Sequence, residues 1–169
     1  LLPCLIISLL VKATSRGKVI YWSDRVGRNE IIFRMPKFRT MQSQAPEKAT
    51  HLIEDPRSLL TPVGSFLRKN SLDEIPQLIS IIKGDLTFVG PRPALYNQLD
   101  LIAMRKAAGV NILTPGITGW AQVNGRDELS ISQKVDFDRE YLESQSFAFD
   151  LYIIWLTFLK VLRRQNISH

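Results

Sequence analysis

The sequence is poor in cysteine and histidine. Its 169 residues include one cysteine, Cys4, and two histidines, His51 and His169. A single cysteine excludes an internal disulfide, and three such side chains are too few for a four-ligand Cys/His zinc cluster. The hydrophobic share of 45% and the charged share of 22% are those of an ordinary folded domain, which excludes a disordered or collagen-like chain.

The two most apolar runs are both too short to cross a bilayer as a helix, which takes about 20 residues. The first, residues 1–11, reads LLPCLIISLLV and is followed by Lys12 and Arg16. A signal peptide has its basic residues before the apolar run, so the order here is reversed. Because the chain also begins without methionine, we expect residues 1–16 to be the second half of a re-entrant membrane helix broken near Pro3. A buried core segment is the alternative.

The second apolar run, FAFDLYIIWLTFLKVL at residues 147–162, has the period of an amphipathic helix. Its apolar stripe consists of Leu151, Ile154, Trp155, Phe158 and Leu162. Ile153 is an exception that lies outside this stripe. Sixteen residues rise about 24 Å as a helix, less than the roughly 30 Å of a hydrocarbon core. With the basic residues that follow, the run predicts an interfacial amphipathic helix over residues 147–164, and ordinary core packing is the alternative.

The net charge of +6 comes from the first quarter of the chain. Residues 1–40 hold eight basic and two acidic residues, whereas the other 129 residues carry 14 of each sign. Charge this polarised predicts a surface that meets phosphate in a nucleic acid, a lipid headgroup or a substrate. The apolar runs at both ends of the chain favour lipid.

The remaining pattern predicts an α+β fold that is mainly helical with a short β-hairpin. The β-rich runs 19–22 and 31–35 flank a polar turn segment, which is typical of a hairpin. Helices are expected over about residues 71–84 and 95–108. Because the sequence has neither repeats nor low-complexity linkers, we expect a single domain over residues 1–169.

Adjacent carboxylates stand at the predicted start of the helix over residues 71–84. Asp73 and Glu74 belong to SLDEIPQL, in which Pro76 suits a first helical turn. One interpretation is capping, because Ser71 and Glu74 have the spacing of a capping box and Asp73 could itself be the cap. The other is a nucleophile, because the positive end of the helix dipole keeps a carboxylate ionised and attracts phosphate. Position alone leaves both interpretations open.

Five basic residues are candidates for binding substrate phosphate: Lys37, Arg39, Arg68, Arg92 and Arg126. Lys37 and Arg39 would point to the same side of an extended KFRTM segment. Arg68 lies just before the acidic pair, and Arg92 stands between two prolines that stiffen its backbone, which suits bidentate phosphate recognition. Arg126 follows the glycine-rich turn PGITGWAQVNG, whose backbone a ligand could approach closely. Solvated side chains on a loop or strand are the alternative for Arg92 and for the KFRTM pair.

Four motifs taken in order resemble the bacterial sugar transferase family, the monotopic polyprenyl-phosphate phosphoglycosyl transferases. The motifs are KFRTM, SLDEIPQL, KGDLTFVGPRP and PGITGWAQVNGR. The tail RRQNIS is more similar to the small, single-domain members, although larger members with upstream transmembrane helices are an alternative. The resemblance implies transfer of a phosphosugar from a UDP-sugar to a polyprenyl phosphate such as undecaprenyl phosphate, with release of UMP. This would be an early membrane step of glycoconjugate assembly, on the cytoplasmic face of the bacterial inner membrane.

The resemblance also implies roles for residues in the motifs. The family's aspartate-glutamate pair falls on Asp73 and Glu74, of which the aspartate attacks the β-phosphorus and forms a covalent phosphosugar intermediate. Glu74 helps to hold Mg²⁺, and Asp73 is the second candidate ligand of the metal. The family's phosphate-binding arginines fall on Arg68 and Arg92. Such roles agree with the chemistry, because the charge of a diphosphate must be neutralised before an anionic carboxylate can approach.

The expected partners are a UDP-sugar, a polyprenyl phosphate and membrane lipid, and no nucleic acid is expected. Two other classes of protein would also explain the basic charge. A non-catalytic module that binds anionic lipid leaves Asp73, Glu74 and Arg92 without a role. A nucleic-acid binder leaves the apolar ends of the chain unexplained.

Overall fold

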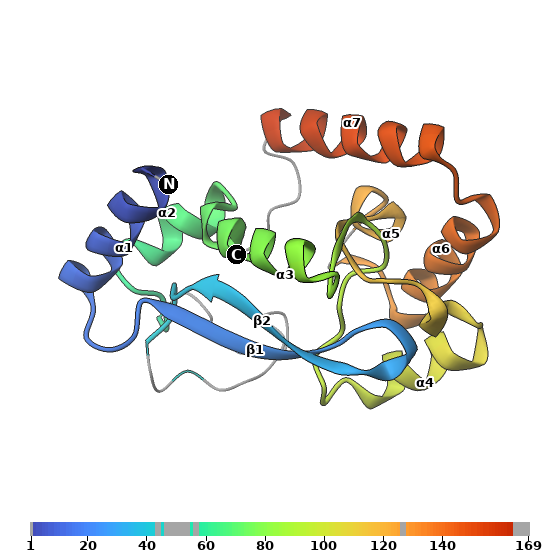
Figure 1. The fold of residues 1–169 in the computed structure, drawn as a ribbon, viewed down its shortest axis with the longest axis horizontal. Helices are drawn as coiled ribbons and strands as arrows, with labels where there is room; N and C mark the ends of the chain where they lie inside the picture. Colours follow the sequence, from blue (N-terminus) through green and yellow to red (C-terminus); the bar gives the residue numbers. More distant parts are fainter. Residues whose placement is uncertain (1, 43–44, 46–54, 56–57, 126–127, 164–169) are drawn as a thin grey trace. The chain divides into compact units, whose positions relative to one another are not determined.

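The computed structural model describes most of the chain, and Figure 1 shows its fold. The described residues are 2–42, 45, 55, 58–125 and 128–163. They form mainly helices, together with two sheets of two strands each, in agreement with the predicted α+β class. The chain divides into two compact units. The first takes its residues from Leu1–Ser23 and Met35–Ile79, and the second from Asp24–Arg34 and Ser80–Ser168.

The predicted β-hairpin is present and consists of β1 (Ile20–Val26) and β2 (Ile32–Phe38). Its turn is a short 3-10 helix, η1 (Arg28–Glu30), in which Asn29 has a φ angle of 54° and Glu30 one of 63°. Asparagine adopts this left-handed conformation more readily than most residues, so Asn29 suits its position in the turn.

Both hairpin strands are longer than the sequence predicts. Beyond the predicted end of the first strand at Trp22, the side chain of Ser23 is buried. The backbone of Arg25 then forms an isolated bridge with Leu95, a partner that the local pattern does not reveal. Both strands pass from one compact unit into the other, and the single domain expected over residues 1–169 stays a prediction.

The core of the first unit includes residues of α1 (Leu2–Thr14), α2 (Gly64–Lys69) and β2. Its buried side chains are Ile7, Val11, Phe38 and Leu67. The chain passes close to itself at Gly64, where a Cβ atom would collide with the carbonyl oxygen of Thr40. α1 buries a narrow face only, and its large exposed side chains are Leu2, Leu5, Ile6, Leu9 and Leu10.

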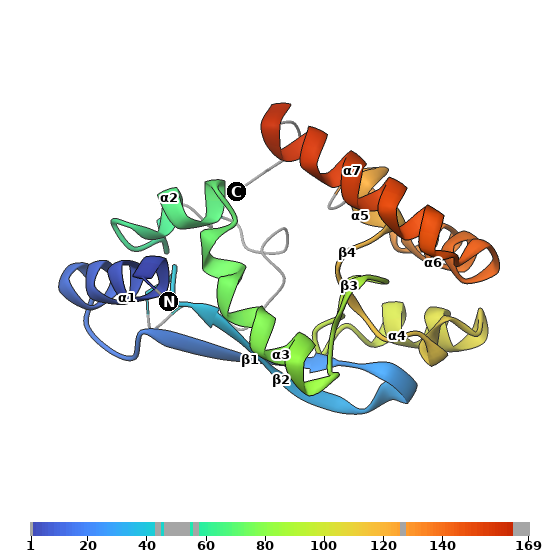
Figure 2. The same ribbon diagram turned by 45° about the horizontal axis from the view of Figure 1, so that its top comes forward.

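The second unit contains two short parallel strands, β3 (Thr87–Val89) and β4 (Gly116–Thr118), which Figure 2 shows side by side. Around them lie α5 (Trp120–Val123), α6 (Ile131–Ser144) and α7 (Phe147–Arg163). Their shared core contains Val89, Val123, Tyr141 and Ile153. A second cluster, made of Ala94, Leu101 and Val135, joins α4 (Leu99–Ala107) to α6.

The helix predicted over residues 71–84 is present, and its type changes along its length. Leu72–Gln77 form a 3-10 helix, η3, which contains Pro76, and Leu78–Lys83 form the α-helix α3. Gly84 follows with a φ angle of 83°, the left-handed conformation that glycine commonly supplies after the last residue of a helix.

The helix predicted over residues 95–108 begins later, at Leu99. The backbone amide of Leu95 donates to Oε1 of Gln98 at 2.8 Å, and Leu95 is also the residue that bridges to β1. These tertiary and local contacts keep residues 95–98 out of the helix, although their side chains would suit it.

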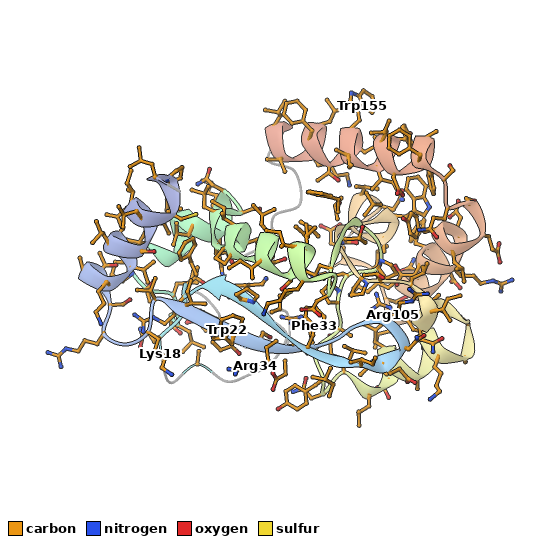
Figure 3. The ribbon with its side chains drawn as sticks, viewed as in Figure 1. Lys18, Trp22, Phe33, Arg34, Arg105 and Trp155 are labelled. Carbon is orange, nitrogen blue, oxygen red and sulfur yellow. The ribbon has the colours of Figure 1, made fainter. Side chains whose placement is uncertain are left out.

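Helix α7 packs on its unit through the side opposite to the predicted apolar stripe. Ile153 is fully buried at 0% exposure, and Oγ1 of Thr157 lies 2.7 Å from Oγ1 of Thr118 in a hydrogen bond. The stripe faces outward, and Figure 3 shows Trp155, which is 55% exposed, projecting from the outer side of the helix. The stripe is therefore not part of the core. Within the ranges that the structure describes, no helix is long and apolar enough to cross a membrane.

We expect Ile153→Ala to lower the free energy of unfolding by about 2–5 kcal/mol, because it leaves a cavity in the core of the second unit. The matched control is Ile154→Ala, because the side chain of Ile154 is exposed on the same helix. This substitution should change the free energy of unfolding by less than about 0.5 kcal/mol. Chemical denaturation followed by circular dichroism measures both. Equal losses would contradict the orientation of α7.

Candidate functional site

The acidic pair, Asp73 and Glu74, lies in the first turn of η3. The capping interpretation is wrong, because the N-cap residue is Ser71 and its side chain makes no capping hydrogen bond. Ser71 has a φ angle of 54°, unlike the extended backbone of a usual N-cap residue. A complete capping box does form elsewhere, between Ser130 and Gln133 at the start of α6. Other interactions therefore hold the two carboxylates.

Residues of the first unit's core fix the position of the charged side chains. The core cluster includes Phe38, Leu67, Leu72 and Ile75. Lys37, Arg68 and the acidic pair are each direct sequence neighbours of one of these residues. Packing of the core therefore brings charged side chains from β2, α2 and η3 to one place.

Glu74 forms an ion pair with Lys37. Nζ of Lys37 donates to Oε1 of Glu74 at 2.8 Å, although the two residues lie 37 positions apart in the sequence. Their side chains are 16% and 18% exposed, so the pair is largely shielded from water. Removal of either partner would leave a poorly solvated charge, which costs more than the loss of a surface pair.

Arg68 is held beside the acidic pair by a hydrogen bond from its Nε to Oγ1 of Thr40, at 2.9 Å. Burial lowers the pKa of the Arg68 guanidinium, and the negative charges of Asp73 and Glu74 oppose that shift. An arginine remains protonated under such a change, so Arg68 supplies a fixed positive charge. The sequence did not single out Thr40, because the hydrogen bond joins residues that are 28 positions apart.

Asp73 is the most buried carboxyl group of this cluster, with 7% exposure. Burial raises the pKa of Asp73 above its ordinary value of 3.8, and the charge of Glu74 adds to the increase. Lys37, Arg68 and the residue's own backbone amide lower the pKa of Asp73, but they do not cancel the rise. A carboxylate in such surroundings gains stability from any cation that comes close to it.

The acidic pair has the donor atoms that Mg²⁺ prefers. This ion takes oxygen ligands, commonly one or two protein carboxylates, and completes its shell with water and substrate phosphates. Among the described residues there is no group of three or more acidic, histidine or cysteine side chains that could hold a metal ion. The carboxylate oxygens of Asp73 and Glu74 are donors of the kind that Mg²⁺ takes from protein.

Arg39 has a partner different from that of Lys37. Its Nη2 donates to the carbonyl oxygen of Ser15 at 2.9 Å and lies 2.7 Å from Oγ of the same residue. Arg39 is 8% exposed and fixes the chain just after α1. Two residues that the sequence assigns to one side of an extended segment therefore make different contacts, and phosphate binding by Arg39 stays a prediction.

Arg92 belongs to the second unit, in the segment GPRP that follows β3. The backbone on its N-terminal side is paired with the strand β4 and the residues around it. The amide of Gly90 donates to the carbonyl of Thr118, and the amide of Gly116 donates to that of Pro91, both at 2.9 Å. A Cβ atom on Gly116 would collide with the amide nitrogen of Gly90, so only glycine permits this approach. Arg92 thus extends from a well-fixed backbone.

Arg126, the last predicted phosphate ligand, lies outside the described residues. The segment before it contains the helix α5, which the turn-rich pattern of residues 115–125 did not predict. Nδ2 of Asn124 donates to the carbonyl of Trp120 at 2.9 Å at the end of that helix.

Of the predicted site residues, the structure brings together four in the first unit: Lys37, Arg68, Asp73 and Glu74.

The sequence that carries these motifs matches a known protein family. The sequence profile of the family described as bacterial sugar transferase matches residues 1–164. The chain belongs to this family. It is therefore an enzyme of the sugar transferase class, and the resemblance noted from its four motifs is confirmed.

Relatives of this sugar transferase are found in several bacteria. It is 40% identical over 159 residues to the uncharacterised sugar transferase EpsL of Bacillus subtilis, a match that covers 94% of the chain and 77% of that protein. It is 40% identical over 167 residues to the UDP-glucose:undecaprenyl-phosphate glucose-1-phosphate transferase of Escherichia coli, covering 91% of the chain and 35% of that protein. The undecaprenyl-phosphate galactose phosphotransferase of Salmonella typhimurium is 36% identical over 183 residues, covering 96% and 37% respectively.

We expect Asp73→Asn to raise the melting temperature of the metal-free protein at about pH 7. The pKa of Asp73 in the folded state is raised above its ordinary value of 3.8. At a pH above that value, ionisation of Asp73 is therefore less favourable in the folded state than in the unfolded state, and it lowers the free energy of unfolding. The gain should shrink at about pH 3.5, where the carboxyl group is largely protonated in both states. Thermal unfolding in EDTA at the two pH values measures the effect.

The control is Asp136→Asn, which changes an exposed carboxylate on α6 in the same way. It should leave the melting temperature nearly unchanged at about pH 7. A lower melting temperature for Asp73→Asn at that pH would show that the ionised carboxylate stabilises the fold, contrary to this expectation.

Proposed function

We propose that this sugar transferase moves a phosphosugar from a UDP-sugar to undecaprenyl phosphate and releases UMP. The observation that carries the proposal is the acidic pair, in which Asp73 is buried and Lys37 and Arg68 lie beside it in the first unit. The names of two relatives specify undecaprenyl phosphate, and one of them specifies UDP-glucose. These names and the motif resemblance support the choice of substrates for this chain.

In the first step an Oδ atom of Asp73 attacks the β-phosphorus of the UDP-sugar. A bond forms between that oxygen and the phosphorus, while the bond from phosphorus to the oxygen bridging the two phosphates breaks. UMP leaves with this oxygen and its electron pair, and a covalent aspartyl-phosphosugar remains. Lys37 and Arg68 favour the ionised carboxylate that the attack requires, because both lower the pKa of Asp73.

In the second step an oxygen of the acceptor phosphate attacks the same phosphorus. The bond between phosphorus and Asp73 breaks, which restores the carboxylate and releases undecaprenyl diphosphate-sugar. The acceptor phosphate is already anionic and the carboxylate is a good leaving group, so the step needs no strong base. A covalent intermediate lets a water-soluble donor and a lipid acceptor use one carboxylate in turn.

Asp73 and Glu74 would hold Mg²⁺, which would neutralise part of the charge of the donor diphosphate. Lys37 keeps Glu74 in a fixed position through their 2.8 Å ion pair. It thereby adds a positive charge next to the acidic pair, and this charge lowers the pKa of Asp73.

Arg68 and Arg92 are proposed to bind the donor phosphates, because a guanidinium group can donate two parallel hydrogen bonds to a phosphate. Arg68 lies close enough to Asp73 for their charges to influence each other's pKa. The role of Arg92 is proposed from its motif, GPRP. The same role for Lys37, Arg39 and Arg126 stays a prediction.

Because undecaprenyl phosphate is a membrane lipid, the reaction has to take place at a membrane surface. The outer face of α7 exposes Leu151, Tyr152, Ile154, Trp155, Phe158, Val161 and Leu162. In the first unit, α1 exposes five apolar side chains and is followed by Arg16 and Lys18. Apolar side chains with adjacent basic residues suit the interface of an anionic bilayer. We place both helices in the cytoplasmic leaflet of the bacterial inner membrane, as parts of a monotopic enzyme.

Turnover can be tested as release of UMP from a panel of UDP-sugars with Mg²⁺ and undecaprenyl phosphate in detergent. We expect release that depends on the acceptor and is abolished by Asp73→Asn, because the covalent intermediate cannot form on an amide. Arg68→Ala and Arg92→Ala should each lower kcat/KM by about tenfold or more, because each removes a charge-assisted contact with phosphate.

The matched control is Asp136→Asn, which should turn over like the unmodified protein. Release of UDP in place of UMP would point to an ordinary glycosyltransferase and contradict the role of Asp73. Near-normal turnover by Asp73→Asn would contradict the covalent scheme even if UMP were the product.

Membrane binding can be tested by sedimentation with vesicles that contain anionic phospholipid. We expect the double substitution Trp155→Glu and Phe158→Glu to weaken binding by about tenfold or more, because it adds charge to the apolar face of α7. Ile131→Glu, at an exposed apolar position on α6, is the control and should bind normally. Unchanged binding by the double variant would contradict insertion of α7.

A further inference from the structure

Two consecutive carbonyl groups around Arg92 are bound by arginine side chains. Nη1 of Arg105 donates to the carbonyl oxygen of Arg92 at 2.8 Å, and Nη1 of Arg25 donates to that of Pro93 at 3.1 Å. These arginines come from α4 and β1, two separate elements of the same unit. Because Pro91 and Pro93 have no backbone N–H, carbonyl groups are the main route by which this segment can be fixed.

Arg105, labelled in Figure 3, is itself held by Asp138 of α6. Nε and Nη2 of Arg105 both donate to Oδ2 of Asp138, at 2.9 and 2.7 Å. Asp138 is 1% exposed and the Arg105 side chain 12%, so this ion pair is shielded from water. All three nitrogens of one guanidinium are therefore used, two for the carboxylate and one for the carbonyl of Arg92.

Stability alone is a weak reason for this arrangement. A buried ion pair often contributes no more to stability than well-packed apolar residues of the same size, because both charges lose their hydration. What the pair does supply is a fixed direction, since the planar guanidinium binds two partners at set angles. A lysine could pair with Asp138, but its single nitrogen could not reproduce both contacts.

We propose that Arg105, oriented by Asp138, is a positioning residue for Arg92 in the transfer reaction. Arg105 acts through the backbone of Arg92: by holding its carbonyl group, it fixes the point from which the Arg92 side chain extends. A side chain that starts from a fixed backbone loses less freedom when it binds phosphate, so binding is stronger. The inference rests on the proposed function, because it assumes that Arg92 binds the donor.

The test is a double-mutant cycle in the UMP-release assay, with Arg105→Lys, Arg92→Ala and their combination. Arg105→Lys keeps the charge opposite Asp138 and loses the contact with Arg92. We expect it to lower kcat/KM for the UDP-sugar about tenfold, mainly through KM, with a melting temperature close to that of the unmodified protein. In the Arg92→Ala background the same change should lower kcat/KM by less than about twofold, because no side chain is left to position.

Arg139→Gln is the control, because it breaks an exposed ion pair with Glu143 on α6, one residue away from Asp138. It should leave kcat/KM unchanged. If Arg105→Lys unfolds the protein, Asp138→Asn takes its place in the cycle, since the amide oxygen can still accept one hydrogen bond from Arg105.

Two results would overturn the inference while leaving the proposed function intact. One is normal kcat/KM in Arg105→Lys, and the other is an equal loss whether or not Arg92 is present, which would mean that Arg105 only maintains the fold. Absence of UMP release by the unmodified protein with every donor would instead reject the proposed function, and the inference with it.

Discussion

The candidate site depends on the cost of burying the negative charge of Asp73 next to that of Glu74. Burial and mutual repulsion both disfavour ionisation of Asp73, and positive charges from other elements offset part of that cost. Lys37 and Arg68 supply these charges, and each is the sequence neighbour of a residue in the core of the first unit. Packing of that core therefore affects the pKa of Asp73 as well as the stability of the fold. A structure optimised for stability alone would have no reason to keep Asp73 in this position.

Helix α7 follows from a constraint of a different kind. Its packed side carries Ile153 together with Asp150 and Thr157, whose polar atoms bond to Tyr141 and Thr118. The polar groups are satisfied inside the unit, so the larger apolar side chains remain on the outside, where water is a poor solvent for them. The period of the sequence predicts which residues share the stripe. It does not predict the direction of the stripe, because a helix of this pattern can turn its apolar side either to a core or to a membrane.

The sequence predicts local structure and local chemistry better than it predicts contacts between distant residues. The hairpin and the helix after Ser71 follow from turn residues and apolar spacing, and the acidic pair follows from its motif. The partner of Glu74 does not, because Lys37 lies in another element and the sequence of KFRTM alone favours a solvated strand face. The late start of α4 and the failure of Ser71 to cap have the same origin. In both cases tertiary contacts or a left-handed backbone override a local preference that the sequence expresses correctly.

The structure holds its two proposed phosphate-binding arginines in different ways. The guanidinium of Arg68 is fixed directly, by its hydrogen bond to Thr40 and by the charges of the acidic pair. Its positive charge is therefore present beside the carboxylates whether or not a donor is bound. Arg92 is fixed through its backbone, at the carbonyl held by Arg105. A guanidinium fixed beside the carboxylates suits a residue that favours the ionisation of Asp73. A backbone held at its carbonyl suits a residue whose side chain has to start from the same point in every catalytic cycle.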